Sequence, residues 1–198
     1  DVYKRQSWWR TQSENLMTGV TDPAVTEHGR MTPYAGLVYD IDDHWSAYAS
    51  YADIFRVQSD LRTADGGSLP PVVGSNYEAG VKSEWLDGRL NTSFALFRIT
   101  ERNRAQSDPN YPEVGDCCYQ ASGQVRSQGF EAEVSGRLAP GWEVAGGYTF
   151  NTTRYLKDAE NGGAPFRTFT PKHIFQLWTT YQLPSECCLL YTSPSPRD

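Results

Sequence analysis

The sequence predicts an all-β fold, an antiparallel up-and-down meander that forms part of a transmembrane β-barrel. Segments in which polar and apolar residues alternate are joined by tight turns at residues 42–44, 86–88 and 139–141. Long hydrophilic loops, at about residues 54–75, 101–124 and 154–170, separate these hairpins. Outer-membrane barrels have short turns at one end and long loops at the other. We therefore expect the short turns to be periplasmic and the long loops extracellular.

Composition excludes two other classes of protein. The chain has 198 residues, of which 38% are hydrophobic, and its mean hydropathy is -0.60. No apolar run approaches the ~20 residues that a membrane-spanning helix needs, whereas a barrel strand turns only alternate residues toward lipid. The formal net charge of -6 argues against nucleic-acid binding, which requires a basic patch.

We expect seven strands, and the first four form two hairpins. The first hairpin joins residues 31–41 to 44–53, and the second joins 76–86 to 89–100. The alternation is clearest in 76–86, where Tyr77 and Val81 share one face and Glu78 and Lys82 share the other. Strands of this length exceed the common ~5–6 residues of globular proteins and reach the ~9–11 of a transmembrane strand.

The remaining strands are expected at residues 125–138, 142–153 and 171–183. Phe130 and Val134 alternate with Glu131 and Glu133 in the first of these, and the pattern is least regular in the last. Residues 7–17 are a candidate for an eighth strand, with 18–29 as a further long loop.

The alternation assigns side chains to two faces of the expected sheet. Five residues are predicted to lie on the convex, lipid-facing side: Tyr77, Val81, Phe130, Val134 and Tyr148. Five charged residues are predicted to face the lumen: Glu78, Lys82, Glu84, Glu131 and Glu133. Trp45, Trp85 and Trp142 would lie at the periplasmic interface, unless they are ordinary core aromatics. A barrel wall supplies paired carboxylates routinely, so we do not expect an enzyme.

Histidine and cysteine spacing predicts no metal site. His28, His44 and His173 are far apart and lack the spacing of metal ligands. Cys117 and Cys118 are adjacent in a long loop. A bond between adjacent cysteines closes a strained ring, so we expect a partner cysteine elsewhere, in a compartment that permits disulfides.

Both ends of the chain resemble translated sequencing adapter. DVYKRQ at residues 1–6 can be back-translated as GATGTGTATAAGAGACAG, and CLLYTS at 188–193 as TGTCTCTTATACACATCT, which is its inverted complement. Such segments are excluded from fold reasoning. We expect residues 1–6 and 188–198 to be adapter-derived, without stable contacts to the sheet. Residues 7–187 would then be an internal piece of a longer reading frame.

Several short motifs occur in one order along the natural part of the chain. They are TPYAGLVYD at 32–40, WSAYASYADIF at 45–55, LPPVVGSNYEAGVK at 69–82, DGRLN at 87–91, ALFRI at 95–99, NRA at 103–105, SQGFE at 127–131 and TPKH at 170–173. In these motifs the chain resembles the TonB-dependent siderophore receptors, with strong likeness to ferric-pyoverdine and ferric-coprogen receptors. The resemblance covers about residues 31–184.

The resemblance implies a plugged barrel of about 22 strands, of which this chain would be an open fragment. It implies a Gram-negative outer-membrane location in contact with outer-membrane lipid, a ferric siderophore as transported ligand, and no cofactor. Energy would arrive from the TonB complex through an N-terminal region that is missing here.

Ligand contacts in the family come from lumen-facing and extracellular-loop residues, often aromatics and arginines. The resemblance therefore suggests Arg102, Arg104, Tyr111, Tyr119, Phe166 and Phe169. Guanidinium groups suit carboxylate or hydroxamate oxygens. These side chains could instead pack the loops or pair with neighbouring carboxylates. Two alternatives to a siderophore receptor also remain open at this point: a passive porin-like channel or barrel adhesin, and a soluble β-sandwich binding module.

Overall fold

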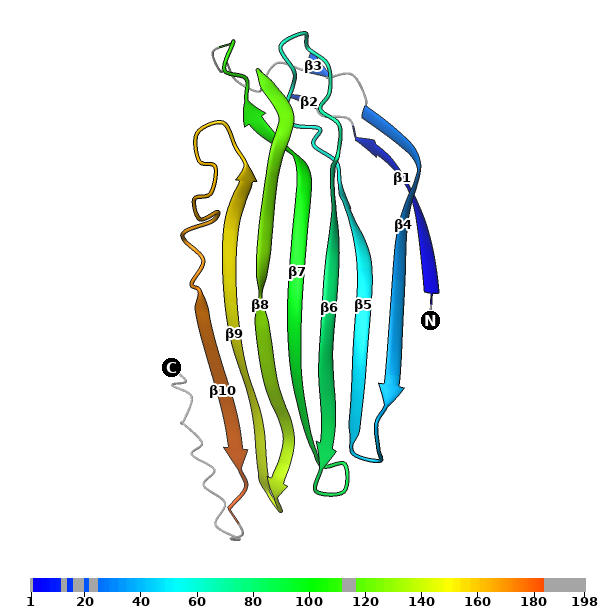
Figure 1. The fold of residues 1–198 in the computed structure, drawn as a ribbon, viewed down its shortest axis with the longest axis vertical. Helices are drawn as coiled ribbons and strands as arrows, with labels where there is room; N and C mark the ends of the chain where they lie inside the picture. Colours follow the sequence, from blue (N-terminus) through cyan, green and yellow to red (C-terminus); the bar gives the residue numbers. More distant parts are fainter. Residues whose placement is uncertain (1, 12–13, 16–19, 22–24, 112–116, 184–198) are drawn as a thin grey trace, which may run out of the picture.

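One antiparallel sheet dominates the computed structural model, which describes residues 2–11, 14–15, 20–21, 25–111 and 117–183. Its strands follow the order β1-β4-β5-β6-β7-β8-β9-β10, and consecutive strands of this order pair antiparallel along their length (Figure 1). Their bounds are β1 Val2–Thr11, β4 Val25–Asp40, β5 Trp45–Arg56, β6 Val72–Trp85, β7 Leu90–Ser107, β8 Tyr119–Ala139, β9 Trp142–Lys157 and β10 His173–Tyr181. A separate pair consists of β2 Glu14–Asn15 and β3 Val20–Thr21.

The seven predicted strands are confirmed as β4 to β10, but several extend further toward the long loops. The β7–β8 ladder continues to the pair Ser107 and Tyr119. From the alternation of side chains, by contrast, we expected these strands to end at residues 100 and 125. Backbone hydrogen bonds hold these polar extensions, and such bonds need no apolar side chains. The pattern of side chains therefore marks where the apolar segment ends, not where the strand ends.

The N-terminal expectations are wrong in three respects. The first strand covers residues 2–11 instead of 7–17, and most of the expected 18–29 loop belongs to β3 and to the start of β4. Val2 to Gln6 pair with Ala35 to Met31, although residues 1–6 were expected to lack stable contacts. An open sheet edge presents unpaired N–H and C=O groups that accept an added extended segment. This pairing leaves the expected adapter origin untested, and residues 188–198 lie outside the described residues.

The register separates the side chains into two faces. Ala47, Val81, Phe94, Ala132 and Tyr148 form one cross-strand row, and we call the face that they share the apolar face. The opposite face, which we call the polar face, carries the charged side chains Glu78, Lys82, Glu84, Glu131 and Glu133. The predicted grouping of these two sets on opposite faces is therefore observed.

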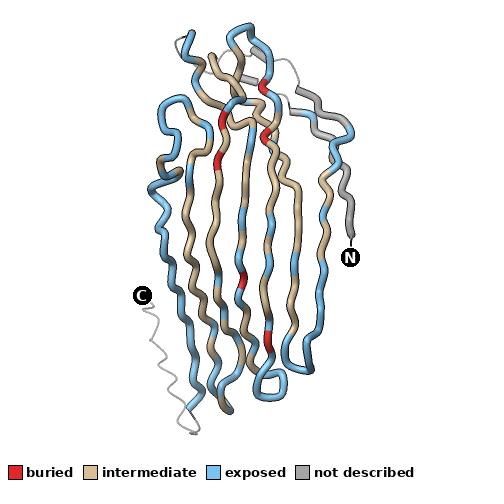
Figure 2. Tube along the Cα trace, viewed as in Figure 1, coloured by how far each residue is buried: buried red, intermediate tan, exposed pale blue. Residues whose placement is uncertain are grey.

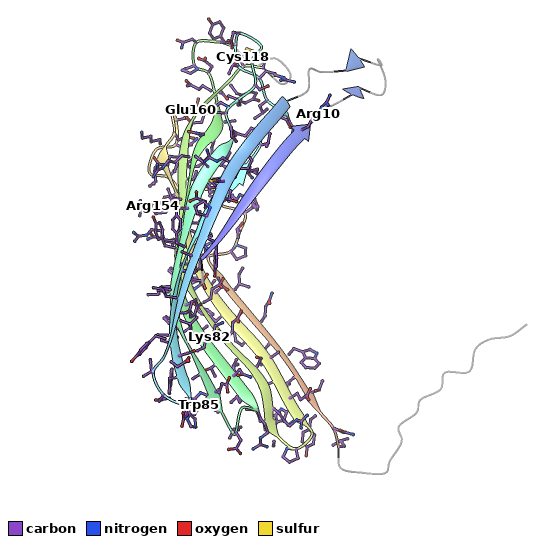
Figure 3. All side chains as sticks on the ribbon, turned by 90° about the vertical axis from the view of Figure 1, so that its right-hand side faces the viewer. Arg10, Lys82, Trp85, Cys118, Arg154 and Glu160 are labelled. Atoms are coloured by element: carbon purple, nitrogen blue, oxygen red, sulfur yellow. A yellow bond between two sulfur atoms is a disulfide. The ribbon has the colours of Figure 1, made fainter. Side chains whose placement is uncertain are left out.

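The sheet is a single curved layer, so little of it is buried (Figure 2). The buried apolar residues of the described part are Leu69, Val72, Ala95 and Val125. Viewed from its edge, the sheet bows, and Arg154 lies on the convex side (Figure 3). Arg154 is in register with Arg126 and Thr100, which belong to the apolar face. The apolar face is thus the convex face, as predicted.

Aromatic side chains pack along the apolar face toward its short-turn end. Trp45 meets Trp85 edge to face at 5.7 Å, and Trp142 meets Tyr181 at 6.4 Å. Both tryptophans of the first pair lie beside tight turns, and their rings remain partly exposed. They lie where an interfacial aromatic girdle of a barrel is found.

Gly129 is a position where the sheet needs a residue without a side chain. A Cβ there would collide with the backbone carbonyl of Phe150, whereas a Cβ at Gly147 would meet only Ala132 O at 3.9 Å and Glu133 Cγ at 4.0 Å. We expect Gly129→Ala to destabilise the full-length protein by about 1–3 kcal/mol, as overpacking does, and Gly147→Ala to be neutral. Urea titration of folded protein measures both. Equal midpoints for the two variants would refute the close approach.

Candidate ligand site at the long-loop end

Arg104, Glu101 and Phe166 come together at the long-loop end of the sheet. Arg104 Nη1 lies 2.6 Å from Glu101 Oε2, and its guanidinium stacks 4.7 Å from the centre of the Phe166 ring. Arg56 lies further from the same carboxylate, at 3.9 Å. The side chains of Arg104 and Glu101 are only 23% and 22% exposed, which strengthens both contacts relative to a fully solvated pair.

A β-bulge explains why Glu101 and Arg104 meet. In a regular strand, residues three apart point to opposite faces. Here the β7–β8 register shifts between Arg102 and Arg104, and Asn103 takes a left-handed backbone conformation with φ of 59°. The extra residue turns Arg104 to the side of Glu101, because a bulge re-aims the side chains that follow it.

Phe166 is held in place by the neighbouring strand β9. The hydroxyl of Thr153 donates to the carbonyl of Phe166, and Tyr155 packs edge to face against its ring at 5.3 Å. The Arg167 guanidinium lies 5.2 Å from the same ring. Tyr155 and Arg167 were absent from the sequence-based candidates. The sequence did contain a signal for Arg167, because it directly follows Phe166, a candidate ligand contact, in a predicted loop.

Two cavities flank this cluster. One of about 220 Å³ is lined by Ile99, Glu101, Val125, Phe166, Arg167 and Thr170. The other, of about 280 Å³, includes Arg104, Tyr119, Tyr155 and Asp158 in its lining. Each combines aromatic or aliphatic walls with charged groups, which is the usual composition of a small-molecule subsite.

The other sequence-based candidates are more dispersed. Tyr119 lines the larger cavity together with Arg104, whereas Tyr111 and Phe169 are 53% and 83% exposed in loops. Arg102 pairs with Val73 and Gln124, so it belongs to the apolar face, opposite Arg104. The structure thus brings Arg104, Tyr119 and Phe166 into one region and leaves the other three outside it.

Gln58 fastens the loop after β5 to the bulge of β7. Its Nε2 donates to the carbonyls of Asn103, at 2.6 Å, and Pro70, at 2.8 Å, and its Oε1 accepts from Ala105 N at 2.9 Å. Asn103 lies at the register shift of β7 and Ala105 follows it, so these hydrogen bonds connect the bulge to the loop that contains Pro70. The side chain of Gln58 therefore stabilises the bulge that positions Arg104.

The cysteine prediction is wrong, because Cys117 and Cys118 form a disulfide with each other. Sequence reasoning treated the strained ring as disfavouring this bond and expected a partner elsewhere. Cys117 also approaches the carbonyl of Thr63 in the preceding long loop, at 3.7 Å. The pair therefore lies where two long loops meet.

Asp158 closes a turn after β9. Its Oδ1 accepts from Asn161 N at 2.7 Å and Glu160 N at 3.1 Å, and its Oδ2 accepts from Gln106 Nε2 at 2.6 Å. Partial burial disfavours the charged form, but these hydrogen bonds outweigh it, so the pKa of Asp158 falls below its ordinary value. The carboxylate therefore stabilises the folded turn more than the acid does.

Acid is expected to open this turn. A lowered pKa gives a stabilisation that is complete above the ordinary value of about 3.9 and is lost as pH falls through the lower, folded value. Amide exchange at Glu160 and Asn161, corrected for intrinsic rates, should therefore lose protection at acid pH in the native protein. Asp158→Asn should remove this pH dependence. An identical acid response in the variant would contradict the role of the carboxylate.

The charged residues of the polar face make contacts lower on the sheet. Glu78 Oε1 accepts from the Tyr48 hydroxyl at 2.6 Å, and Lys82 Nζ lies 5.1 Å from the centre of the same ring. Glu133 lies 3.5 Å from Ser93. Within the described ranges, no group of three or more His, Cys, Asp or Glu could hold a metal ion, and no helix could span a membrane.

Comparison with known proteins places the chain in a family. The family described as "TonB dependent receptor-like, beta-barrel" matches residues 5–188. The chain is 41% identical over 187 residues to the ferric-pyoverdine M114 receptor of Pseudomonas sp. strain M114, covering 90% of the chain and 22% of that receptor. It thus spans about a fifth of that relative.

Solved structures of outer-membrane receptors are similar to this chain in fold as well as in sequence. The ferripyoverdine receptor of the Pseudomonas aeruginosa outer membrane, bound to ferripyoverdine, superposes with a TM-score of 0.77 at 40% identity, over 92% of this chain and 23% of that one. The alcaligin outer-membrane receptor of Bordetella pertussis gives 0.74 at 40% identity, over 93% and 31%. The chain belongs to the TonB-dependent receptor family, whose barrel wall its sheet reproduces.

Proposed function

We propose that this chain is a wall segment of an outer-membrane receptor that imports a ferric siderophore, with energy supplied through TonB. The observation that carries the proposal is the 41% identity to a ferric-pyoverdine receptor along nearly the whole chain. The open sheet supports it, because a wall segment needs further strands at both edges to close a barrel. The family is one of receptors, not enzymes.

The two faces of the sheet have separate roles in this proposal. The convex apolar face meets membrane lipid, and the polar face with Glu78, Lys82, Glu84, Glu131 and Glu133 lines the lumen. The alternation of lipid-facing and lumen-facing residues is the pattern that barrels require. The siderophore is cargo, so no resident cofactor is needed.

The proposed ligand region is the cluster at the long-loop end. Arg104 and Phe166 offer a cation stacked on an aromatic ring, beside cavities lined by Tyr119, Tyr155 and Arg167. Such groups suit the flat, oxygen-rich surface of an iron chelate. Tyr111 and Phe169 remain predicted contacts that closure of the complete barrel would have to bring nearer. Arg102 also remains a prediction, but it lies on the face opposite Arg104, which barrel closure would not change.

Growth under iron limitation tests the proposal. The full-length gene containing this chain is expressed in a receptor-deficient Gram-negative host, which is fed single ferric siderophores. We expect one siderophore class to restore growth in a strain with TonB and not in a strain without it. Restored growth that persists without TonB would instead indicate a passive channel, and failure with every siderophore, despite protein in the outer membrane, would refute the proposal.

A further inference from the structure

Three arginines lie side by side on the apolar face, where it approaches the long loops. Arg126 of β8 lies directly opposite Arg154 of β9, and Arg98 of β7 lies opposite Gln128, two residues further along β8. Side chains at such directly opposed and diagonal positions are neighbours on one face of a sheet. We call Arg98, Arg126 and Arg154 the arginine patch.

Among the described residues, no ion pair supplies a counter-ion to the arginine patch. The ion pairs of the described residues involve Arg56, Arg104 and Arg137, and none involves a patch residue. Arg126 is half-buried, and its Nε is enclosed without an acceptor in the described part of the chain. The Nε atom itself is out of reach of a ligand, so an external anion would bind the terminal nitrogens of these guanidinium groups. An anion there is favoured because a guanidinium without partners is costly to desolvate.

Asp53, a carboxylate on this face, does not fill that role. Asp53 shares the cross-strand row of Arg126, but Ser75 and Thr100 separate the two. Asp53 also accepts a hydrogen bond from the hydroxyl of Tyr51. The arginine patch therefore keeps its positive charge on the convex side of the sheet.

The patch lies where a membrane would place lipid head groups. On β9, the apolar face runs from Trp142, through Tyr148 and Phe150, to Thr152, and Arg154 follows. That stretch rises about 34 Å at ~3.4 Å per residue, or about 26 Å along the membrane normal at a tilt of ~40°. The apolar band of an outer-membrane barrel is ~25 Å tall. The arginine patch therefore lies at the edge of the hydrocarbon region.

A groove on the same face continues from the patch into the apolar band. It has a volume of about 810 Å³, and its lining includes Tyr77, Leu96, Phe130 and Phe150, with Arg98 and Gln128 also contributing. Glu78 is the acidic residue of the lining, but its side chain points to the polar face and accepts a hydrogen bond from Tyr48. On the apolar face the groove thus has an apolar floor with the cationic residue Arg98 in its wall. This amphipathic arrangement matches an acyl chain attached to an anionic head group.

We propose that the arginine patch and this groove bind a phosphate-bearing lipid of the outer leaflet. The phosphate group lies among Arg98, Arg126 and Arg154, and an acyl chain lies over Leu96, Phe130 and Phe150. Guanidinium groups match phosphate oxygens in bidentate geometry. The membrane supplies this occupant continuously, because the patch and the apolar band share one surface. The inference rests on the proposed membrane orientation, but it does not depend on which ligand is transported.

Lipid binding by the full-length receptor tests the proposal. The receptor is placed in phosphatidylcholine nanodiscs with fluorescent diphosphoryl lipid A, and energy transfer from its tryptophans reports proximity. We expect the triple variant Arg98→Gln, Arg126→Gln, Arg154→Gln to bind about tenfold more weakly, a change of about 1.4 kcal/mol. Arg137→Gln, an exposed arginine at the opposite end of β8, should bind as the native protein does. Unchanged binding by the triple variant would overturn the proposal.

Two further measurements distinguish the lipid from free phosphate, and lipid binding from transport. Inorganic phosphate alone should not displace the labelled lipid at physiological concentration, and displacement would assign the site to free phosphate instead. Siderophore uptake by the triple variant is measured in parallel. Lost lipid binding with normal uptake supports the lipid site as independent of transport. Native lipid binding in a receptor that imports no siderophore would refute the proposed function and leave the lipid site standing.

Discussion

Ala49→Arg is expected to lower the free energy of unfolding of the full-length receptor by about 2–4 kcal/mol, the cost of arginine on the lipid face near the bilayer midplane. Ala49 belongs to the apolar face, because it pairs with Leu37 and Ala79. It is small and exposed, so the larger side chain breaks no packing in the sheet. The loss of unfolding free energy therefore measures whether lipid or water surrounds this side chain.

The neighbouring residue provides a matched control. Ser50 points to the polar face and lies directly opposite Glu78, so Ser50→Arg gains a carboxylate partner. We expect its free energy of unfolding to change by less than about 1 kcal/mol. Urea titration of both variants, refolded into lipid vesicles, measures the difference. Equal destabilisation by the two substitutions would contradict the assignment of the apolar face to lipid.

Arg104→Ala is expected to weaken binding of the transported ferric siderophore by about ten- to a hundredfold, the range for a lost charged hydrogen bond of ~1.5–3 kcal/mol. The guanidinium combines a charge with a flat surface stacked on Phe166. Arg104→Lys keeps the charge but loses the planar fork. We therefore expect it to recover part of the lost affinity.

A second arginine at the same end of the sheet controls for loop damage. Arg62 lies in the loop after β5 and donates to Ser68 Oγ at 2.9 Å. Arg62→Ala should leave the dissociation constant unchanged. Quenching of tryptophan fluorescence in the full-length receptor, titrated with the siderophore identified by growth, measures all three variants. Heat modifiability on a gel verifies that the Arg104→Ala receptor is correctly folded. Native affinity in that folded variant would exclude Arg104 from the ligand site.

The strands and their two faces could be predicted from the sequence, since each depends on local patterns. Alternation around Tyr77 and Glu78 specifies which side chains share a face, because a strand has a period of two. The turns at residues 42–44, 86–88 and 139–141 specify which strands pair. The predicted positions of the strand ends were less accurate, because backbone ladders continue through polar residues such as Ser107 and Tyr119.

The candidate site depended on contacts between segments that are distant in sequence. Arg104 and Phe166 were both predicted, but their stacking depends on the bulge at Asn103 and on contacts of Phe166 with β9. A bulge reverses the face of the residues after it, so alternation could not assign Arg104 to the face of Glu101. Tyr155 joined the site only through the same loop packing.

From the amino-acid sequence alone we could therefore predict the all-β meander, the separation of an apolar from a polar face, and the resemblance to the receptor family. Those properties follow from local periodicity and ordered motifs. The folded sheet was needed to show that Arg98, Arg126 and Arg154 adjoin on the convex face, and that Gln58 bonds to the bulge beneath Arg104. These contacts depend on register, because cross-strand hydrogen bonds decide which residues of different strands are neighbours, and no single strand contains that information.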